Sequence, residues 1–279
     1  MTILSEIRAE YAEVGTPARP PRRKPVVPLY VYSGLTVLAI IAIWWVAAAL
    51  ELVSPVFLPS PAVVAVSAWN LLTVGFVDST LLEHVTASLG RILGALLVSI
   101  LIGVPAGIAI GTSRLGRGIL DPIVEFLRPL PPLAYLPLII IWVGIGEASK
   151  ITVIALSMLP AIILSTAAGV KSASSDHVNA ARSFGATRSQ LLRHVILPSA
   201  LPSILTGIRI ALGTGWSTLV AAELVAATRG LGFMIQSAAQ FLVTDVVIAG
   251  IGVIALIAIL LELVARALER WLVPWAGEK

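Results

Sequence analysis

Three arginines stand inside apolar stretches of this sequence, where fixed positive charge suits the binding of an anion. They are Arg91, Arg128 and Arg209. A charged side chain at the centre of a bilayer costs about 2.5–3.5 kcal/mol on insertion scales, so each arginine needs an ionic partner or a water-filled cavity. We therefore place all three, together with the acidic Glu223, in a candidate substrate pathway.

Each arginine also has a simpler interpretation. Arg91 stands near one end of its stretch, where a long side chain can extend to the membrane surface. Arg128 follows Glu125 by three residues, which is ion-pair spacing on a helix. Arg209 lies about one and a half turns into its stretch, close enough to the inner face to reach it. The sequence leaves both interpretations open.

The chain carries no motif for catalysis. It contains no G-x-x-x-x-G-K-[ST] phosphate loop, no H-E-x-x-H and no G-x-S-x-G. Its histidines, His84, His177 and His194, have no metal-ligand spacing, and the absence of cysteine excludes disulfides and zinc–thiolate sites. We expect no catalytic residue, no metal and no cofactor bound by this chain.

Composition places the chain in a membrane. Hydrophobic residues make up 58% of it and charged residues only 12%, whereas about a quarter of a soluble chain is charged. Too few polar residues remain to coat a water-soluble domain of this length. The net charge of +4 does not indicate nucleic acid, because the basic residues are scattered and only 6% of residues are aromatic. We predict an all-α membrane protein in contact with lipid.

Six stretches are long and apolar enough to span the hydrocarbon core, which takes about 20 residues. They are residues 29–50, 89–110, 123–145, 151–170, 204–222 and 246–265. The third is irregular, because Pro129, Pro131, Pro132 and Pro137 each remove a backbone donor. Broken backbone survives at membrane depth only where protein or a water-filled cavity satisfies it, so this segment is buried in a bundle or lines a pathway.

Basic residues predict the orientation. With the N-terminus inside, the inner segments hold fourteen of the 19 Lys and Arg, three more lie within spans, and only Lys150 and Arg229 lie outside. Residues 1–28 are then a cytoplasmic arm, 29–50 a first anchor, 51–84 a periplasmic loop and 269–279 a cytoplasmic tail. A signal peptide cleaved near residues 47–49 is the alternative for the first stretch, but its apolar run is too long.

A stripe of small residues marks the second stretch. Gly103, Gly107 and Gly111 are four apart, which places them on one helix face. Such a stripe lets a neighbouring backbone approach closely, so we expect helix packing here and not substrate contact.

The segment between the fourth and fifth stretches predicts two short helices joined at a glycine. Asp176 or Ser175 can cap the first helix, and Gly185 suits the left-handed residue that ends it. Thr187 and Gln190 have the spacing of a capping box for the second helix.

Two prolines, Pro198 and Pro202, are expected to end the second short helix and lead into the fifth span. Ala180 and Ala181 are small enough for a partner surface to approach, and Arg182 offers it a fixed charge. Such an element can transmit motion into the membrane, although an ordinary connector is the alternative.

The run A-A-x-x-x-G, followed after nine residues by V-I-L-P, resembles the loop by which binding-protein-dependent ABC importer permeases dock on their ATPase subunits. The matching positions are Ala180, Ala181, Gly185, Leu197 and Pro198, with Asn179 in place of the family's glutamate and Val195 in place of its isoleucine. The resemblance implies that the ATPase-coupling loop comprises Asn179, Ala180, Ala181, Arg182, Ser183, Phe184, Gly185 and Ala186.

The resemblance covers most of residues 57–267. Segments such as L-L-E-H-V-T-A-S-L-G-R-I and W-V-G-I-G-E-A-S-K-I are similar to the nitrate/sulfonate/taurine branch of this family, and G-W-S-T-L-V-A-A-E-L-V-A-A-T-R-G-L-G-F-M-I is similar to its taurine permeases. The resemblance implies a type I ABC importer permease fold over residues 85–268 and a pathway for taurine or a related alkanesulfonate.

The same resemblance implies the partners. They are a second copy of this chain, two cytoplasmic ATP-binding subunits that use the ATP, and a periplasmic or lipid-anchored substrate-binding protein, all at a bacterial inner membrane. Nucleic acid is not among them.

Three other functions compete with this one. An importer of the same branch can carry nitrate or bicarbonate. An ion-coupled secondary transporter would need carboxylates or unwound helices at mid-membrane in a repeated pair of halves, and the sequence has no such repeat. A structural anchor protein has no use for the interrupted third span or the intramembrane arginines.

Overall fold

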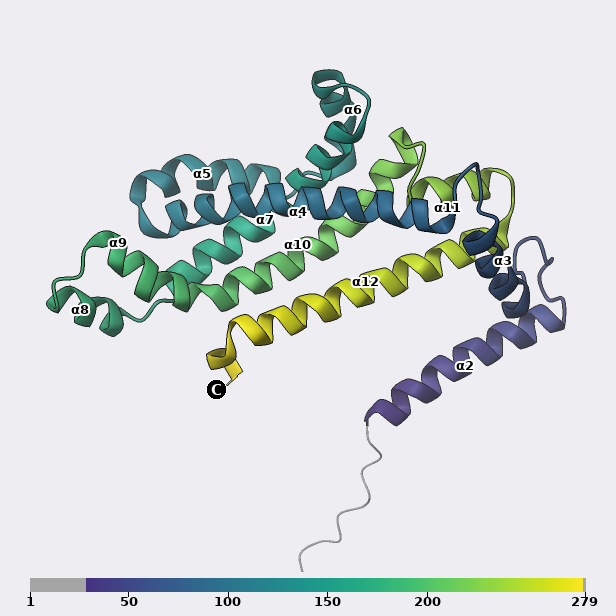
Figure 1. Ribbon diagram of the computed structural model, residues 1–279, viewed down its shortest axis with the longest axis horizontal. Helices are drawn as coiled ribbons and strands as arrows, with labels where there is room; N and C mark the ends of the chain where they lie inside the picture. Colours follow the sequence, from purple (N-terminus) through teal and green to yellow (C-terminus); the bar gives the residue numbers. More distant parts are fainter. Residues whose placement is uncertain (1–28, 278–279) are drawn as a thin grey trace, which may run out of the picture. The chain divides into compact units, whose positions relative to one another are not determined.

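The structure is a computed structural model that describes residues 29–277. Its described residues are helices joined by short connections, with no β-structure beyond an isolated bridge between Phe76 and Ser79 (Figure 1). The predicted all-α class is confirmed. The predicted N-terminal arm, residues 1–28, and the last two residues of the tail lie outside the described residues. The chain divides into two units, residues 1–47 and 48–279, which we describe separately.

The first unit contributes α2 (Leu29–Ala49), a helix without a charged residue. Apolar side chains are exposed all around it, including Leu38 and Ile43. A helix that is hydrophobic on every side suits a lipid environment. Its bounds match the predicted first span to within one residue.

The second unit contains the remaining helices. They are α3 (Pro61–Thr73), α4 (Leu81–Thr112), α5 (Arg114–Leu127), α6 (Pro132–Val143), α7 (Glu147–Lys171), α8 (Ser175–Ser183), α9 (Arg188–Leu191), α10 (Leu197–Ala226), α11 (Leu231–Gln240) and α12 (Thr244–Leu272). A π-helical stretch, Leu192–Ile196, joins α9 to α10, and a 3₁₀ turn, Pro274–Gly277, follows α12. Over the described residues, five helices, α2 included, are long and apolar enough to span a membrane, and a sixth span results if the bent pair α5 and α6 counts as one.

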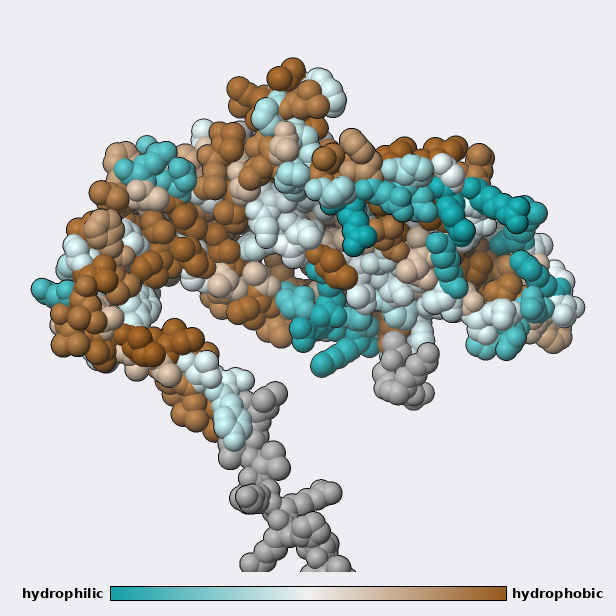
Figure 2. Space-filling model, turned by 180° about the vertical axis from the view of Figure 1, so that it is seen from behind, coloured by the Kyte–Doolittle hydropathy of each residue, from teal (hydrophilic) through white to brown (hydrophobic). Residues whose placement is uncertain are grey.

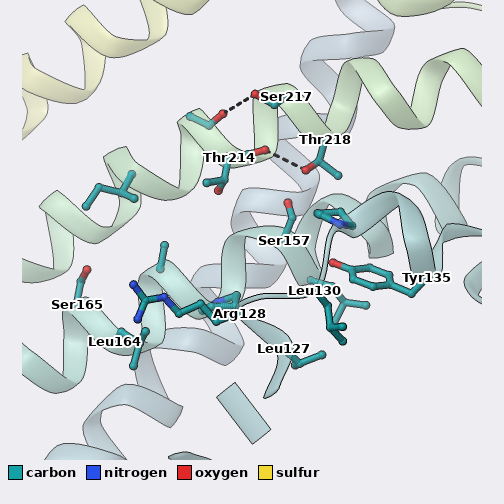
Figure 3. Close-up of a pocket in the computed structure, with 16 residues that line it drawn as sticks. Leu127, Arg128, Leu130, Tyr135, Ser157, Leu164, Ser165, Thr214, Ser217 and Thr218 are labelled. Atoms are coloured by element: carbon teal, nitrogen blue, oxygen red, sulfur yellow. Dashed lines mark hydrogen bonds between the residues drawn. The ribbon is translucent and has the colours of Figure 1, made fainter. Parts of the chain in front are cut away.

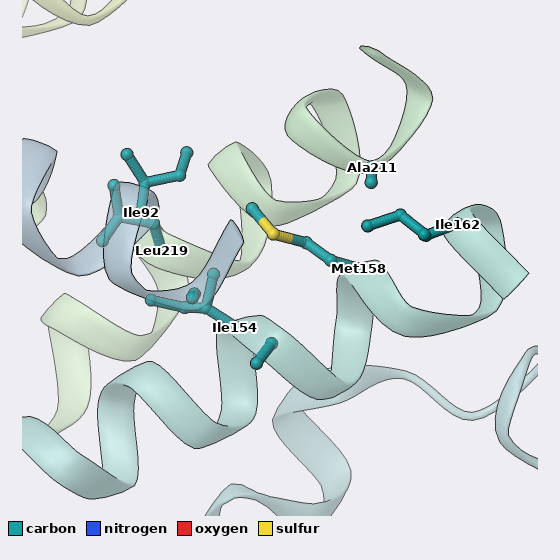
Figure 4. Close-up of a cluster of buried hydrophobic side chains, with 8 residues drawn as sticks. Ile92, Ile154, Met158, Ile162, Ala211 and Leu219 are labelled. Atoms are coloured by element: carbon teal, nitrogen blue, oxygen red, sulfur yellow. The ribbon is translucent and has the colours of Figure 1, made fainter. Parts of the chain in front are cut away.

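The three helices α4, α7 and α10 form the centre of the second unit, with α7 packed against both of the others (Figure 1). Buried Ile92, Ile154, Met158 and Leu219 fill the space where they meet (Figure 4). These side chains come from all three helices, so this core fixes the positions of the helix faces that line the cavity described below.

The glycine stripe of α4 packs as predicted. Gly103 faces Ile162, and Gly111 faces Val170, both on α7. A Cβ added at Gly107 would lie 2.6 Å from the carbonyl oxygen of Ile163, so the two backbones approach too closely for a larger residue. The stripe therefore joins α4 to α7 along much of their length.

The irregular third span is two helices. α5 and α6 are bent by 107° at the proline-rich break between them. Pro131 and Pro132 stand at the N-cap and first position of α6, where a missing N–H costs no helical hydrogen bond. The predicted single span over residues 123–145 is therefore corrected, because α5 already begins at Arg114 and the chain turns after Leu127.

The segment predicted as a loop, residues 51–84, contains the helix α3 and the start of α4. Ser60 caps α3 and Pro61 occupies its first position. Thr80 and Glu83 form a capping box that starts α4 at Leu81. The predicted tail from residue 269 is also too long, because α12 continues to Leu272.

Much of the surface of this chain is apolar. Large hydrophobic side chains such as Leu101, Ile141 and Leu263 are exposed, and Figure 2 shows broad apolar areas interrupted by polar patches. Exposed apolar surface of this extent requires a lipid or protein cover. It agrees with the bilayer environment that composition predicted.

Candidate substrate cavity and coupling loop

A cavity of about 680 Å³ lies where α7, α10 and the break between α5 and α6 meet (Figure 3). Its lining residues are Leu127, Arg128, Leu130, Pro132, Tyr135, Leu156, Ser157, Pro160, Ala161, Leu164, Ser165, Ile210, Gly213, Thr214, Ser217 and Thr218. The volume falls within the range of small-molecule sites. Pro132 and the neighbouring residues of the break thus border a cavity, as the sequence predicted for broken backbone at membrane depth.

Arg128 supplies the positive charge of this cavity. Among the described residues that line it, Arg128 alone is charged at neutral pH. The ion pair with Glu125 that the spacing allowed is absent: within residues 29–277, the Arg128 guanidinium forms no ion pair and no hydrogen bond, although the Arg128 backbone N–H donates to the carbonyl oxygen of Val124. Arg128 follows the last residue of α5, where the chain begins to turn, and Figure 3 shows its side chain extending toward Ser165.

Hydroxyl groups supply most of the remaining polarity. Ser157 and Ser165 project from α7, and Thr214, Ser217 and Thr218 project from α10. The three α10 positions are spaced i, i+3 and i+4, which places them on one helix face. These hydroxyls were not among the predicted site residues, although their spacing is visible in the sequence.

Arg91 belongs to a different place, a buried ionic cluster. Its Nε and Nη2 donate to the two carboxylate oxygens of Glu147 at 2.6 and 2.8 Å. Its Nη1 donates to Glu223 at 2.6 Å and to the carbonyl oxygen of Arg229 at 2.7 Å. Lys150 donates to Glu147 at 2.7 Å. The Arg91 side chain is only 5% exposed, and protein groups satisfy it, one of which, Glu147, is 59% exposed.

Glu223 completes the cluster and holds the start of α11. Its side chain is fully buried and accepts hydrogen bonds from the Ser88 hydroxyl at 2.7 Å and the Gly232 N–H at 2.8 Å. The neighbouring N–H groups of Gly230 and Leu231 donate to His84 and Ser88. The cluster therefore connects α4, α7, α10 and α11. Lys150 was predicted to lie in an outer segment, and neither its role here nor that of Glu147 was predicted.

Arg209 lies in a third place, between α10 and α12. Its Nη2 donates to Glu262 at 2.6 Å and its Nη1 to Glu269 at 2.8 Å. Arg266 donates to the same Glu262 at 2.8 Å. The four candidate pathway residues therefore divide into three groups: Arg91 with Glu223, Arg128 in the cavity, and Arg209 with the acids of α12.

The loop between α7 and α10 contains the two short helices that the sequence predicted. Gly185, with φ of +78°, separates α8 from α9, and Thr187 and Gln190 form a capping box. The expected cap at Asp176 or Ser175 is wrong by one or two residues, because the N-cap position is Ser174 and its side chain makes no capping hydrogen bond.

The junction between this loop and α10 differs from the prediction. Pro198 and Pro202 do not end the helix; they lie in the first turns of α10. The π-helical stretch Leu192–Ile196 carries the backbone from α9 into α10. The wider helical turn makes a continuous path possible where an α-helix would clash with proline. The loop is therefore joined directly to a helix that lines the cavity.

The surface of the loop is suited to contact with another molecule. Phe184 is 93% exposed, next to a hollow of about 370 Å³ lined by Ala181, Gly185, Gln190 and others. A large exposed aromatic residue beside a hollow is typical of an anchor for a partner.

Comparisons with known proteins agree on one family. A sequence model described as "Binding-protein-dependent transport system inner membrane component" matches residues 99–274. The taurine transport system permease protein TauC of Escherichia coli (strain K12) is 58% identical over 247 residues, which cover 87% of this chain and 89% of that protein. The putative aliphatic sulfonates transport permease protein SsuC of the same organism is 38% identical over 236 residues, covering 85% and 88%.

A solved structure shares the fold. A chain of the MetNI methionine ABC transporter, in an inward-facing conformation, superposes with a TM-score of 0.63 at 22% identity. The match covers 69% of this chain and 95% of that chain. The ABC transporter permease fold that the sequence resemblance predicted is therefore confirmed.

Proposed function

Because the chain belongs to the family of binding-protein-dependent transport system inner membrane components, we propose that it forms the membrane pathway of an ATP-driven importer for taurine or a related alkanesulfonate. The observation that carries the substrate class is the similarity, over most of the chain, to permeases named for taurine and for aliphatic sulfonates. The cavity is consistent with it, because its one charged residue is a cation and a sulfonate is a permanent anion.

The proposed complex contains two copies of this chain, two ATP-binding subunits and a substrate-binding protein. The ATP is used by the ATP-binding subunits, since this sequence has no phosphate loop. The segment Asn179 to Ala186 docks on them, with Phe184 as its anchor and Gly185 as its turn. Because the π-helical stretch joins this loop to α10, movement of the loop is transmitted to the cavity wall.

Of the four candidate pathway residues, Arg128 keeps that role in this proposal. Arg91 and Glu223 have their hydrogen bonds taken up by other protein groups, and Arg209 is paired twice. We assign these three residues to holding the helices together. We retain the permease domain over residues 85–268 in this proposal.

ATP hydrolysis by the reconstituted complex tests the substrate class. Taurine-loaded binding protein is expected to stimulate hydrolysis above the rate with empty binding protein, because only the loaded form delivers substrate to the pathway. Stimulation by nitrate or bicarbonate and by no sulfonate would reject the substrate and leave the importer function standing. An ion-coupled transporter would show no dependence on ATP at all.

Gly185→Trp tests the coupling loop. A bulky residue at φ of +78° strains the turn and obstructs a docking surface, so uptake and association with the ATPase are expected to be lost while the permease remains in the membrane. Gly118→Trp is the matched control, because Gly118 also faces open space but lies in α5. Normal uptake by Gly185→Trp would show that the loop is not the docking element.

We propose that both termini and the loop lie in the cytoplasm, on the strength of the basic residues counted above. The chain has no cysteine, so single cysteines report without background. An impermeant thiol reagent is expected to label Asp78→Cys in intact cells and Thr187→Cys only after lysis. Labelling of position 187 from outside would reverse the orientation.

A further inference from the structure

We propose that the Arg128 cavity binds a short aminoalkanesulfonate by both of its ends, with Arg128 taking the sulfonate and acceptor oxygens of α7 and α10 taking the ammonium. This inference rests on the proposed function, in which the chain conducts such a molecule. It adds a binding site within the permease itself, with a distinct set of groups for each end of the substrate.

The donor end of the cavity is formed by Arg128 and Ser165. A sulfonate has three oxygens that only accept hydrogen bonds, and the guanidinium offers five N–H donors in a planar fork. Within residues 29–277, neither the Arg128 guanidinium nor the Ser165 hydroxyl makes a hydrogen bond. Both lie in the same part of the cavity, toward which Figure 3 shows the Arg128 side chain extending. These donors are free to bind an anion.

The acceptor end is formed by hydroxyl groups whose protons are already engaged. Ser157 donates to the carbonyl oxygen of Ile154 at 2.7 Å, and Thr214 donates to that of Ala211 at 3.0 Å. Thr218 likewise donates to the carbonyl oxygen of Thr214 at 3.0 Å. Each hydroxyl oxygen is thereby left as an acceptor facing the cavity. An ammonium group has three donors and no acceptor, so it is the complement of such a wall.

A proline adds a backbone acceptor to the same wall. Pro160 lies inside α7 and has no N–H to donate to the carbonyl group of Leu156, four residues earlier. Leu156 and Pro160 both line the cavity, next to Ser157. A carbonyl group deprived of its helical partner at membrane depth needs another donor. The ammonium end of the substrate supplies one.

The two ends contribute unequally. The sulfonate meets a full positive charge, whereas the ammonium meets only neutral oxygens, because no carboxylate is among the described lining residues. Hydrogen bonds at both ends are charge-assisted, but only the sulfonate also gains the Coulomb attraction of an opposite full charge, that of Arg128. The sulfonate therefore accounts for most of the affinity, and the ammonium accounts for the preference for taurine over a simple alkanesulfonate.

Binding to the assembled permease–ATPase complex, without binding protein, tests the inference. Taurine, ethanesulfonate and ethylammonium are titrated against the complex in lipid nanodiscs by calorimetry. Taurine is expected to bind, ethanesulfonate to bind about tenfold more weakly, and ethylammonium not to bind at millimolar concentration. A complex that hydrolyses ATP with loaded binding protein but binds no sulfonate would overturn the inference and leave the proposed function intact.

Two variants separate the ends. Arg128→Gln is expected to weaken taurine and ethanesulfonate alike, by at least tenfold. Thr214→Val removes one acceptor at nearly constant volume, so it is expected to weaken taurine about threefold to tenfold and leave ethanesulfonate unchanged. Equal losses for both ligands in Thr214→Val, or unchanged binding in Arg128→Gln, would overturn the two-ended mode.

Matched controls lie on the same elements. Thr206→Val removes a hydroxyl of α10 that bonds to the carbonyl oxygen of Pro202 and does not line the cavity. Arg117→Gln removes a charge of α5 that does not line it either. Neither is expected to change binding. If Arg128→Gln fails to assemble, Arg128→Lys is the substitute, because it keeps the positive charge without the planar set of guanidinium donors. Weaker binding of both sulfonates, with an unchanged ratio of taurine to ethanesulfonate affinity, supports the inference. Full affinity for both contradicts it.

Discussion

Arg91 and Arg128 show two ways in which one chain accommodates an arginine in an apolar segment: Arg91 is buried and Arg128 is exposed. Arg91 is 4% exposed and uses Nε, Nη1 and Nη2 in bonds to two carboxylates and a carbonyl oxygen. Arg128 stands at a break in the backbone, beside a cavity, and its guanidinium makes no hydrogen bond with any described residue. The first charge is satisfied by the protein, and the second is available to a ligand.

This difference predicts a structural role for Arg91 and a ligand-binding role for Arg128. A buried charge with every partner in place stabilises only while all of the partners remain, because removing one leaves another uncompensated. A charge that faces a polar cavity is solvated by water or ligand and can be removed at small structural cost. Substitution of the first should therefore affect assembly, and substitution of the second should affect transport.

Arg91→Gln is expected to have the largest effect. The substitution leaves two carboxylates, Glu147 and Glu223, with only one positive charge nearby, that of Lys150, and Glu223 is fully buried. Breaking a buried pair in this way costs about 3–5 kcal/mol, so the permease is expected to be almost absent from the membrane. Immunoblotting of membranes measures the amount of permease, and thermal unfolding of the detergent-solubilised complex measures its stability.

Removing the opposing charge is the control. In Arg91→Gln with Glu223→Gln, two neutral amides replace the pair, and Glu147 retains Lys150. The double variant is expected to be more stable than Arg91→Gln alone, by about 1–3 kcal/mol, because no isolated buried charge remains. Equal loss in the single and double variants would mean that hydrogen bonding and shape, and not charge, hold the cluster together.

Arg128→Gln is expected to leave the amount of permease in the membrane unchanged and to lower taurine uptake about tenfold. The guanidinium has no protein partner to lose among the described residues, whereas the substrate loses a charge-assisted bond. Uptake of labelled taurine, normalised to the permease present, measures the effect. Loss of the permease from the membrane would show that Arg128, like Arg91, is needed for assembly, and would contradict the proposed difference between them.

The sequence identified these arginines but not their surroundings. Charge is rare in apolar stretches, so the sequence drew attention to Arg91, Arg128 and Arg209. For each arginine, its position along the chain suggested a local way of satisfying the charge. The partners of Arg91 are 56 and 132 residues away, so no local spacing indicates them. Glu125, the local partner suggested for Arg128, does not pair with it, because the chain turns after Leu127.

Local signals performed best where local physics decides. The capping box at Thr187 and the turn at Gly185 were read correctly, because each depends on residues within one helical turn. The same capping rule, applied to Thr80 and Glu83, would have found the start of α4. Pro198 and Pro202 were misread because a π-helical stretch, for which there is no simple sequence rule, precedes them and lets both lie in the first turns of α10.

Arg209→Gln is expected to have the smallest effect and provides an intermediate case. Arg209 has two acidic partners, like Arg91, but its side chain is 26% exposed, so solvent can replace part of what is lost. Its Nε is buried without a hydrogen-bond partner in the described part of the chain, and the substitution removes that unsatisfied donor.

Of the two acids that Arg209→Gln leaves behind, Glu269 loses its ion-pair partner at a side chain that is 26% exposed, and Glu262 keeps one. Glu262 keeps Arg266 at 2.8 Å, so one ion pair between neighbouring turns of α12 survives. Partly exposed pairs contribute little on average, so the amount of permease in the membrane is expected to fall by no more than about twofold, with unchanged uptake per permease. Adding Arg266→Gln, which isolates Glu262, should deepen the loss. If Arg209→Gln alone removes the permease as completely as Arg91→Gln, then burial does not distinguish the two clusters, and the number of acidic partners decides how much an arginine stabilises this bundle.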